Sequence, residues 1–104
     1  MTRSEFVQLC KAEKESLIAQ YMGPGSTTAV AAKIAVLRPT PEQLPLVREI
    51  IDGVLTDVFY TLLLALDGCA SLGGRQINYR LMDEEGNLLT GSGEIEPAAF
   101  DAFQ

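Results

Sequence analysis

The residues most able to do chemistry lie close together in the stretch Leu62 to Gln76, LLLALDGCASLGGRQ. An acid, a thiol and a hydroxyl, from Asp67, Cys69 and Ser71, stand there among three glycines after an apolar run. This set is typical either of an active-site loop or of the end of a buried helix. Glycine-rich loops hold phosphate where they lead into a helix N-terminus, because free N–H groups then face the anion. Here the glycines follow the helix, where carbonyls are exposed, so no phosphate site is predicted.

The same helix end disfavours nucleophilic catalysis. The helix C-terminus and the Asp67 carboxylate are expected to raise the pKa of Cys69, and no histidine is present to activate Ser71. We expect Gly68 to end the helix in the left-handed conformation, while Asp67 binds loop N–H groups. Contact of Asp67 and Ser71 with a partner is the functional alternative. Cys10 and Cys69 are expected to be two buried thiols rather than a disulfide.

The sequence contains no arrangement of residues typical of a metal or cofactor site. Histidine, the commonest zinc ligand, is absent, and the two cysteines lie far apart. Asp52 and Asp57 stand about 140° apart around a helix and so do not share a site. We therefore predict no catalytic, metal-binding or cofactor-binding residue, and a protein that is not an enzyme. The weakest alternative is a small enzyme with Asp67 as the acid of a pocket beside the helix end.

The acidic residues are unevenly distributed along the chain. The formal net charge is −6, and residues 83–104 carry six acids and no base, so they account for all of it. This charge disfavours nucleic acid and anionic membranes as partners. No apolar run approaches the ~20 residues that a membrane span needs. The chain does not open with a signal-peptide pattern, so we expect a cytoplasmic protein.

An acidic region of one sign is expected to attract a basic protein partner and to speed its approach. The predicted partner-binding residues are Asp83, Glu84, Glu85, Glu94 and Glu96. Tyr79 or Phe103 would anchor the partner if exposed. The plainer interpretation is a solvated acidic face that aids solubility.

Apolar spacing predicts three helices before residue 67. The first begins at a capping box of Thr2 and Glu5 and ends at Gly23, and the second covers about residues 28–37. The third restarts near Leu44 and keeps helical spacing for about six turns at ~3.6 residues each. Its last turns are apolar nearly all round, so we expect them to be buried in the core or in a homodimer.

The apolar period changes from helical to two after Gly74. Ile77, Tyr79 and Leu81 alternate with polar residues, which predicts a strand, and DEEGN at 83–87 predicts a hairpin loop with positive φ angles at Gly86 and Asn87. LLTG at 88–91 would return as the second strand, and PAAFDAF at 97–103 would form a last helix. The sequence thus predicts one α+β domain over residues 1–104: three helices, the third long and buried, then a β-hairpin and a short C-terminal helix.

Two segments of the C-terminal half resemble small bacterial proteins of unknown function. They are DGVLTDVFYTLLLALDGCASLGG at 52–74 and YRLMDEEGNLLTG at 79–91, followed by the acidic end. Some of the proteins they resemble are similar to immunity partners of secreted toxins. The resemblance implies a bacterial source and a binding role, and no site residues. We therefore expect an immunity-type or inhibitor-type binding module that acts through its acidic C-terminal surface, with a homodimeric structural protein as the alternative.

Overall fold

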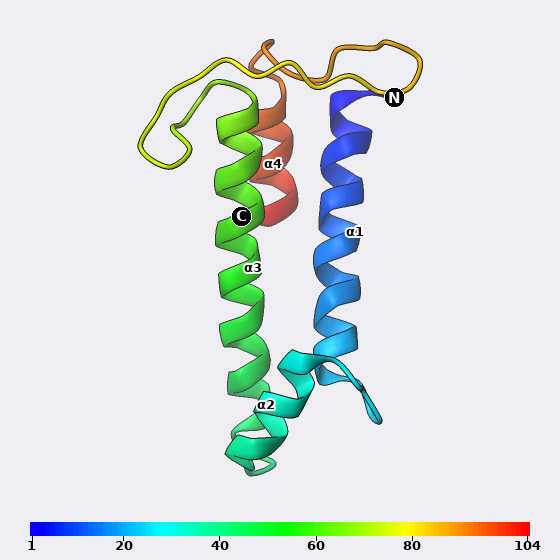
Figure 1. Cartoon of the computed structure of the whole chain (residues 1–104), viewed down its shortest axis with the longest axis vertical. Helices are drawn as coiled ribbons and strands as arrows, with labels where there is room; N and C mark the ends of the chain where they lie inside the picture. Colours follow the sequence, from blue (N-terminus) through cyan, green and yellow to red (C-terminus); the bar gives the residue numbers. More distant parts are fainter.

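The computed structural model describes residues 1–104 as four helices without a β-sheet. The helices are α1 (Arg3–Met22), α2 (Ala29–Leu37), α3 (Leu44–Leu66) and α4 (Ile95–Phe103). α1 and α3 run antiparallel side by side, and α4 packs against both at the end that holds the N-terminus (Figure 1). α2 lies at the opposite end and contacts α1 only. The molecule is elongated, with extents of 46 × 30 × 23 Å.

The helix starts follow the predicted capping residues. Thr2 Oγ1 accepts the N–H of Glu5 at 3.1 Å, as expected for the first half of a capping box. Before α3, Thr40 Oγ1 accepts the N–H of Gln43, while Gln43 Oε1 accepts the N–H of Thr40 at 2.8 Å. This reciprocal pair fixes the turn ahead of α3, and the predicted helix start at Leu44 is confirmed.

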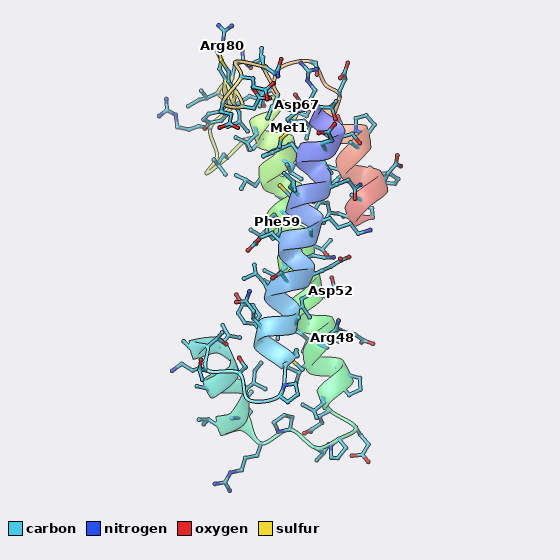
Figure 2. All side chains as sticks on the ribbon, turned by 90° about the vertical axis from the view of Figure 1, so that its right-hand side faces the viewer. Met1, Arg48, Asp52, Phe59, Asp67 and Arg80 are labelled. Atoms are coloured by element: carbon cyan, nitrogen blue, oxygen red, sulfur yellow. The ribbon has the colours of Figure 1, made fainter.

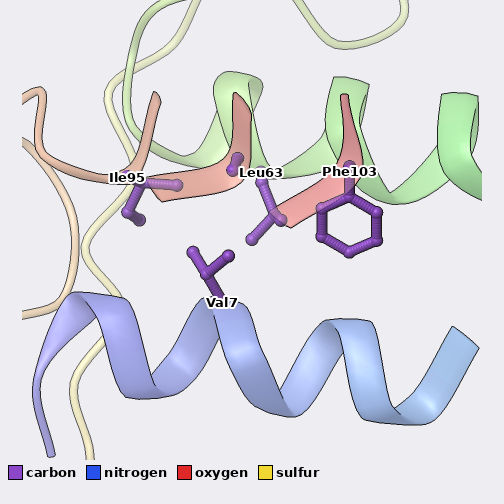
Figure 3. Close-up of a cluster of buried hydrophobic side chains, with 5 residues drawn as sticks. Val7, Leu63, Ile95 and Phe103 are labelled. Atoms are coloured by element: carbon purple, nitrogen blue, oxygen red, sulfur yellow. The ribbon is translucent and has the colours of Figure 1, made fainter. Parts of the chain in front are cut away.

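The core is a small cluster where α1, α3 and α4 meet. It contains five buried residues: Val7, Leu63, Ile95, Ala99 and Phe103 (Figure 3). The ring of Phe103 also stacks on Phe59, with ring centroids 6.0 Å apart. Only 11 of the 104 residues are buried in the whole chain, so this cluster supplies most of the apolar stabilisation.

An ion pair and a hydrogen bond link α1 to α3 next to the core. Lys14 Nζ donates to Asp52 Oδ1 at 2.9 Å and to Thr56 Oγ1 at 3.1 Å, and it lies 5.5 Å from the centroid of the Phe103 ring. The ammonium hydrogen bond holds the pKa of Asp52 below its ordinary value, and the Thr56 hydroxyl acts in the same direction. The Lys14 side chain is buried between the two helices.

The predicted β-hairpin is wrong, and with it the α+β fold class. Residues 67–94 contain only two isolated bridges, Leu72 with Arg75 and Met82 with Leu88, and otherwise form an extended loop across the end of the bundle (Figure 1). The tight turn does form, with Gly86 at φ +86°, but Asn87 does not take a positive φ. The chain therefore turns where the sequence predicts, without building strands on either side.

The hydroxyl of Thr90 explains why the two arms do not become strands. Thr90 Oγ1 accepts the N–H of Leu81 at 3.1 Å and donates to the carbonyl of Tyr79 at 2.6 Å. These two backbone groups would otherwise pair with backbone groups of the opposite arm. Because a buried side chain satisfies them instead, the ladder ends after the bond from the Leu89 N–H to the Leu81 carbonyl.

The prediction that the third helix is buried is also wrong for most of its length. Within α3 only Leu63 and Ala65 are buried, both in the last turn and a half. α4 has nine residues and covers only this end of α3, so the remaining turns have α1 as their one neighbour. A helix with one neighbouring helix buries one face and leaves the opposite face exposed.

We expect the substitution Leu63→Ala to lower the free energy of unfolding by about 2–5 kcal/mol, because it removes a fully buried side chain and leaves a cavity. Urea unfolding followed by circular dichroism measures the change. Leu9→Ala is the matched control, since Leu9 is an exposed leucine on α1, and it should change the value by less than about 0.5 kcal/mol. Equal losses in the two variants would contradict the assignment of the core.

Candidate functional site

Asp67 lies at the C-terminus of α3 and holds the start of α4. Its Oδ1 accepts the N–H of Gly91 at 2.8 Å, and its Oδ2 accepts the N–H of Ile95 at 3.1 Å. The residue is 5% exposed, at the same end of the molecule as Met1 (Figure 2). Asp67 does bind backbone N–H groups, but they belong to Gly91 and to Ile95 of α4 and not to the residues that directly follow α3. Gly68 takes the predicted left-handed conformation, with φ +78°. Both carboxylate oxygens serve backbone donors, so Asp67 does not stand as an acid in an open pocket.

The other two polar residues of this loop are exposed and do not converge with Asp67. Cys69 is exposed, so its predicted burial is wrong, and Cys10 is only half-buried. The Cys69 thiol donates to the Asp67 carbonyl at 3.8 Å. Partial desolvation, followed by the carboxylates of Glu96 and Asp67, raises the pKa of this thiol. Ser71 is exposed and makes no hydrogen bond, so the loop assembles no nucleophile with a base.

The acidic residues predicted to bind a partner do gather at one end of the molecule, but two of them have partners within the chain. The Met1 ammonium lies 2.9 Å from Asp83 Oδ2, and Arg3 Nη1 lies 3.2 Å from Glu94 Oε2. The Met1 ammonium and the Asn87 amide hold the pKa of Asp83 far below its ordinary value. The sequence distance between these partners, 82 and 91 residues, hid both pairs from sequence analysis.

Glu84, Glu85 and Glu96 remain exposed and form no ion pair. Arg80 lies in the same loop region as Glu84 and Glu85 (Figure 2). The surface of this end therefore carries basic as well as acidic side chains. Its charge is less uniformly negative than the sequence of residues 83–104 indicates.

No cluster of three or more metal-ligating side chains forms in the structure. A mixed hollow of about 460 Å³ lies beside the N-terminus, lined by Met1, Arg3, Asn87 and Glu94 among others. The Met1 ammonium and the Glu94 carboxylate already have the ion-pair partners described above. No helix is both long enough and apolar enough to cross a membrane.

The largest feature that sequence analysis missed is an apolar surface along α3. Five aliphatic residues spaced four apart form one exposed row, here called the outer row: Leu46, Ile50, Val54, Val58 and Leu62. The next row around the helix, here called the inner row, is also apolar: Val47, Ile51, Leu55, Phe59 and Leu63. The inner row is half-buried or buried, with its last members in the core cluster, whereas Ile50, Val54 and Val58 are 55–58% exposed.

The outer row continues into a groove between α2 and the first turns of α3. This α2–α3 groove has a volume of about 610 Å³, and seven of its eight lining residues are hydrophobic. Val36 and Leu37 at its edge are 79% and 76% exposed, and α2 has no buried residue. The sequence does contain a signal for this surface, namely two adjacent apolar rows on one helix. A helix that packs against a single neighbouring helix needs only one apolar row, so the second row is left for another contact.

No family model, curated protein or solved structure matches this chain. The resemblance to immunity partners of toxins therefore stays a prediction from the sequence.

We expect Asp67→Ala to lower the free energy of unfolding by about 2–4 kcal/mol, because two charge-assisted hydrogen bonds are lost and the N–H of Ile95 is left buried without an acceptor. Asp67→Asn keeps one accepting oxygen and should lose less. Asp101→Ala, at an exposed acid on α4, is the control and should stay within about 0.5 kcal/mol of the parent. Urea unfolding measures all three variants, and a parent-like Asp67→Ala would refute the anchoring role.

We expect the Cys69 thiol to react slowly, because its raised pKa leaves little thiolate at neutral pH. The measurement is the rate of iodoacetamide alkylation in a Cys10→Ala variant, folded and then in urea. Alkylation of the folded chain should be several-fold slower than that of the unfolded chain. A faster rate in the folded chain would instead indicate an activated cysteine.

Proposed function

We propose that this chain is a non-enzymatic protein-interaction module whose binding surface is the outer row of α3 together with the α2–α3 groove. The observation that carries this proposal is the row itself: five consecutive positions on one helix face are aliphatic and exposed. No other part of the chain covers them. A solvated helix face normally carries polar residues at these positions.

Elementary energetics support an interface at this surface. Each methylene removed from water contributes about 0.8 kcal/mol, and a row of large aliphatic side chains offers many of them. Extended apolar patches on the surface of a soluble chain mark interaction sites. The exposed residues Glu49 and Asp57, each one position before an outer-row residue, give the surface a polar rim on one side, as protein interfaces have.

A second candidate is the acidic surface around Glu84, Glu85 and Glu96, on which the immunity-type prediction depends. The observation in its favour is that these three carboxylates are exposed and unpaired at one end of the molecule. Their field would steer a basic protein toward this end. The two surfaces lie at different places on the chain, so one experiment separates them.

The test is site-specific photo-crosslinking in the cells that make the protein. A photo-reactive phenylalanine analogue replaces Val54 in the outer row, Glu85 in the acidic loop, or Leu9 on α1 as the control. We expect a discrete covalent adduct from position 54, because a partner in the interface lies against this side chain. Mass spectrometry identifies what is attached.

Leu9 is a suitable control because it is 55% exposed and Val54 is 57% exposed. An adduct from position 85 alone would favour the acidic surface and contradict the proposal for α3. Equal yields from positions 54 and 9, or no adduct from position 54, would also contradict it.

A further inference from the structure

We infer that a second copy of this chain covers the outer row, in a two-fold dimer whose α3 helices cross antiparallel at Gly53 and Val54. This inference rests on the proposed function, which assigns the surface but leaves its occupant open. Four observations identify the occupant: the overall size of the chain, an unexplained glycine, the pattern of the row and the distribution of charge.

The chain exposes more surface than a compact monomer of its mass. A folded monomer of 11.2 kDa exposes about 5,700 Å², whereas this chain exposes 6889 Å². Its radius of gyration is 16.2 Å, against about 13 Å for a compact domain of this length. A standard interface removes about 800 Å² from each partner. The excess, about 1,200 Å² by the same scaling, is thus enough for one such interface.

Gly53 is unexplained within the single chain. It lies in the interior of α3, where glycine costs about 0.5–1 kcal/mol relative to alanine. A Cβ atom at this position would meet nothing within 4 Å, so the chain's own packing does not require a glycine. Glycine is favoured where another backbone approaches closely. Gly53 lies one position before Val54, about 100° around α3 on the side of the outer row away from the inner row. A close approach at Gly53 would therefore lie beside the middle of the outer row.

The outer row is complementary to itself. Two-fold association places one surface patch against an identical patch, so the patch must be able to pack against itself. A row of aliphatic residues centred on Val54 can do so. In the antiparallel pair Ile50 of one copy lies toward Val58 of the other. A ridge of residues spaced four apart packs between the same ridges of a second helix at a crossing angle of about −50°.

The charge distribution selects the antiparallel arrangement. The exposed acids Glu84 and Glu85 lie in the loop that follows α3, and Glu96 lies in the first turn of α4, which packs against α3 near its C-terminal end. A parallel pair would bring the two sets of carboxylates together. The antiparallel pair separates them. It also brings the exposed Leu72, which lines a shallow apolar hollow with Val58 and Leu62, to the α2 end of the partner.

The dimer explains why α2 is almost entirely apolar although none of its residues is buried in the single chain. The nine residues of α2 are AVAAKIAVL. Isolated helices shorter than about 12–15 residues are marginal in water. Apolar contacts from the second copy would stabilise α2 on the side of the groove.

The experiment is sedimentation equilibrium of the full chain and of three charge variants at micromolar concentration. The parent should sediment at twice the 11.2 kDa of one chain. Val54→Glu and Val54→Lys each place two like charges at the two-fold axis, and each should weaken the dimer by more than about 100-fold. An equal mixture of the two variants should restore a dimer, because opposite charges then meet. Phe100→Glu, at an equally exposed position on α4, should leave the parent dimer unchanged.

Gly53 provides a readout in which folding and association change in opposite directions. Gly53→Ala should raise the helix stability measured by circular dichroism at high dilution, and Gly53→Gln should weaken the dimer at least tenfold while keeping the helix. A structural role for Gly53 within one chain would instead lower stability in both variants.

A monomeric parent, or a Val54→Glu variant that remains dimeric, would overturn the inference. So would failure of the mixed charge variants to associate. The proposed function fails by a different result, the lack of a photo-crosslink at position 54. If position 54 attaches a protein of another mass while the parent is a monomer, the second copy is refuted and the interface on α3 stands.

Discussion

The two hydrogen bonds that Asp67 accepts hold the packed end of this protein together. One joins the residue after α3 to Gly91, in a loop that has almost no regular structure of its own, and the other joins it to Ile95, the first residue of α4. Because the carboxylate fixes where α4 begins, Ile95, Ala99 and Phe103 enter the space between α1 and α3. Without this fixed point the short α4 would have no defined position, and Val7 and Leu63 would lose their cover.

The molecule therefore has a closed end and an open end. Lys14 marks the boundary, since its ammonium pairs with Asp52 while it lies over the Phe103 ring of the core. Beyond the Lys14–Asp52 ion pair, α3 has a neighbouring helix on one side only. The apolar side chains of α2 are not buried by any other part of the chain. The proposed binding surface lies along α3 and at the open end, whereas the core that stabilises the fold lies at the closed end.

Sequence analysis predicted the parts that depend on neighbouring residues. The cap at Thr2 and the helix end at Gly68 depend on residues that are close in the sequence, so a sequence pattern can predict them. The predicted hairpin is wrong because alternation of apolar and polar residues does not determine what pairs with the backbone, and Ile77, the first apolar residue of the pattern, is itself exposed. The Thr90 hydroxyl, 11 residues from Tyr79, takes the place of a backbone partner.

The surfaces were harder to predict because they depend on contacts between distant residues. Asp83 and Glu94 form ion pairs with the first residues of the chain, which no pattern in residues 83–104 reveals. The spacing of apolar residues in the sequence includes the outer row. Whether this row contacts another helix or solvent depends on the length and position of α4, which the spacing does not show. The sequence therefore indicated an apolar helix and could not indicate which of its faces stays exposed.

The core has a consequence for the order of events during synthesis. Val7 shares the core cluster with Ile95, Ala99 and Phe103, so the core joins residues that are made well apart in time. At translation rates of about 5–20 residues per second, α1 waits roughly 5–20 s for α4. During this time Val7 and Leu63 are exposed on a growing chain. Closure of the core therefore waits until α4 has been made, and an interrupted polypeptide that stops before Ile95 cannot complete it.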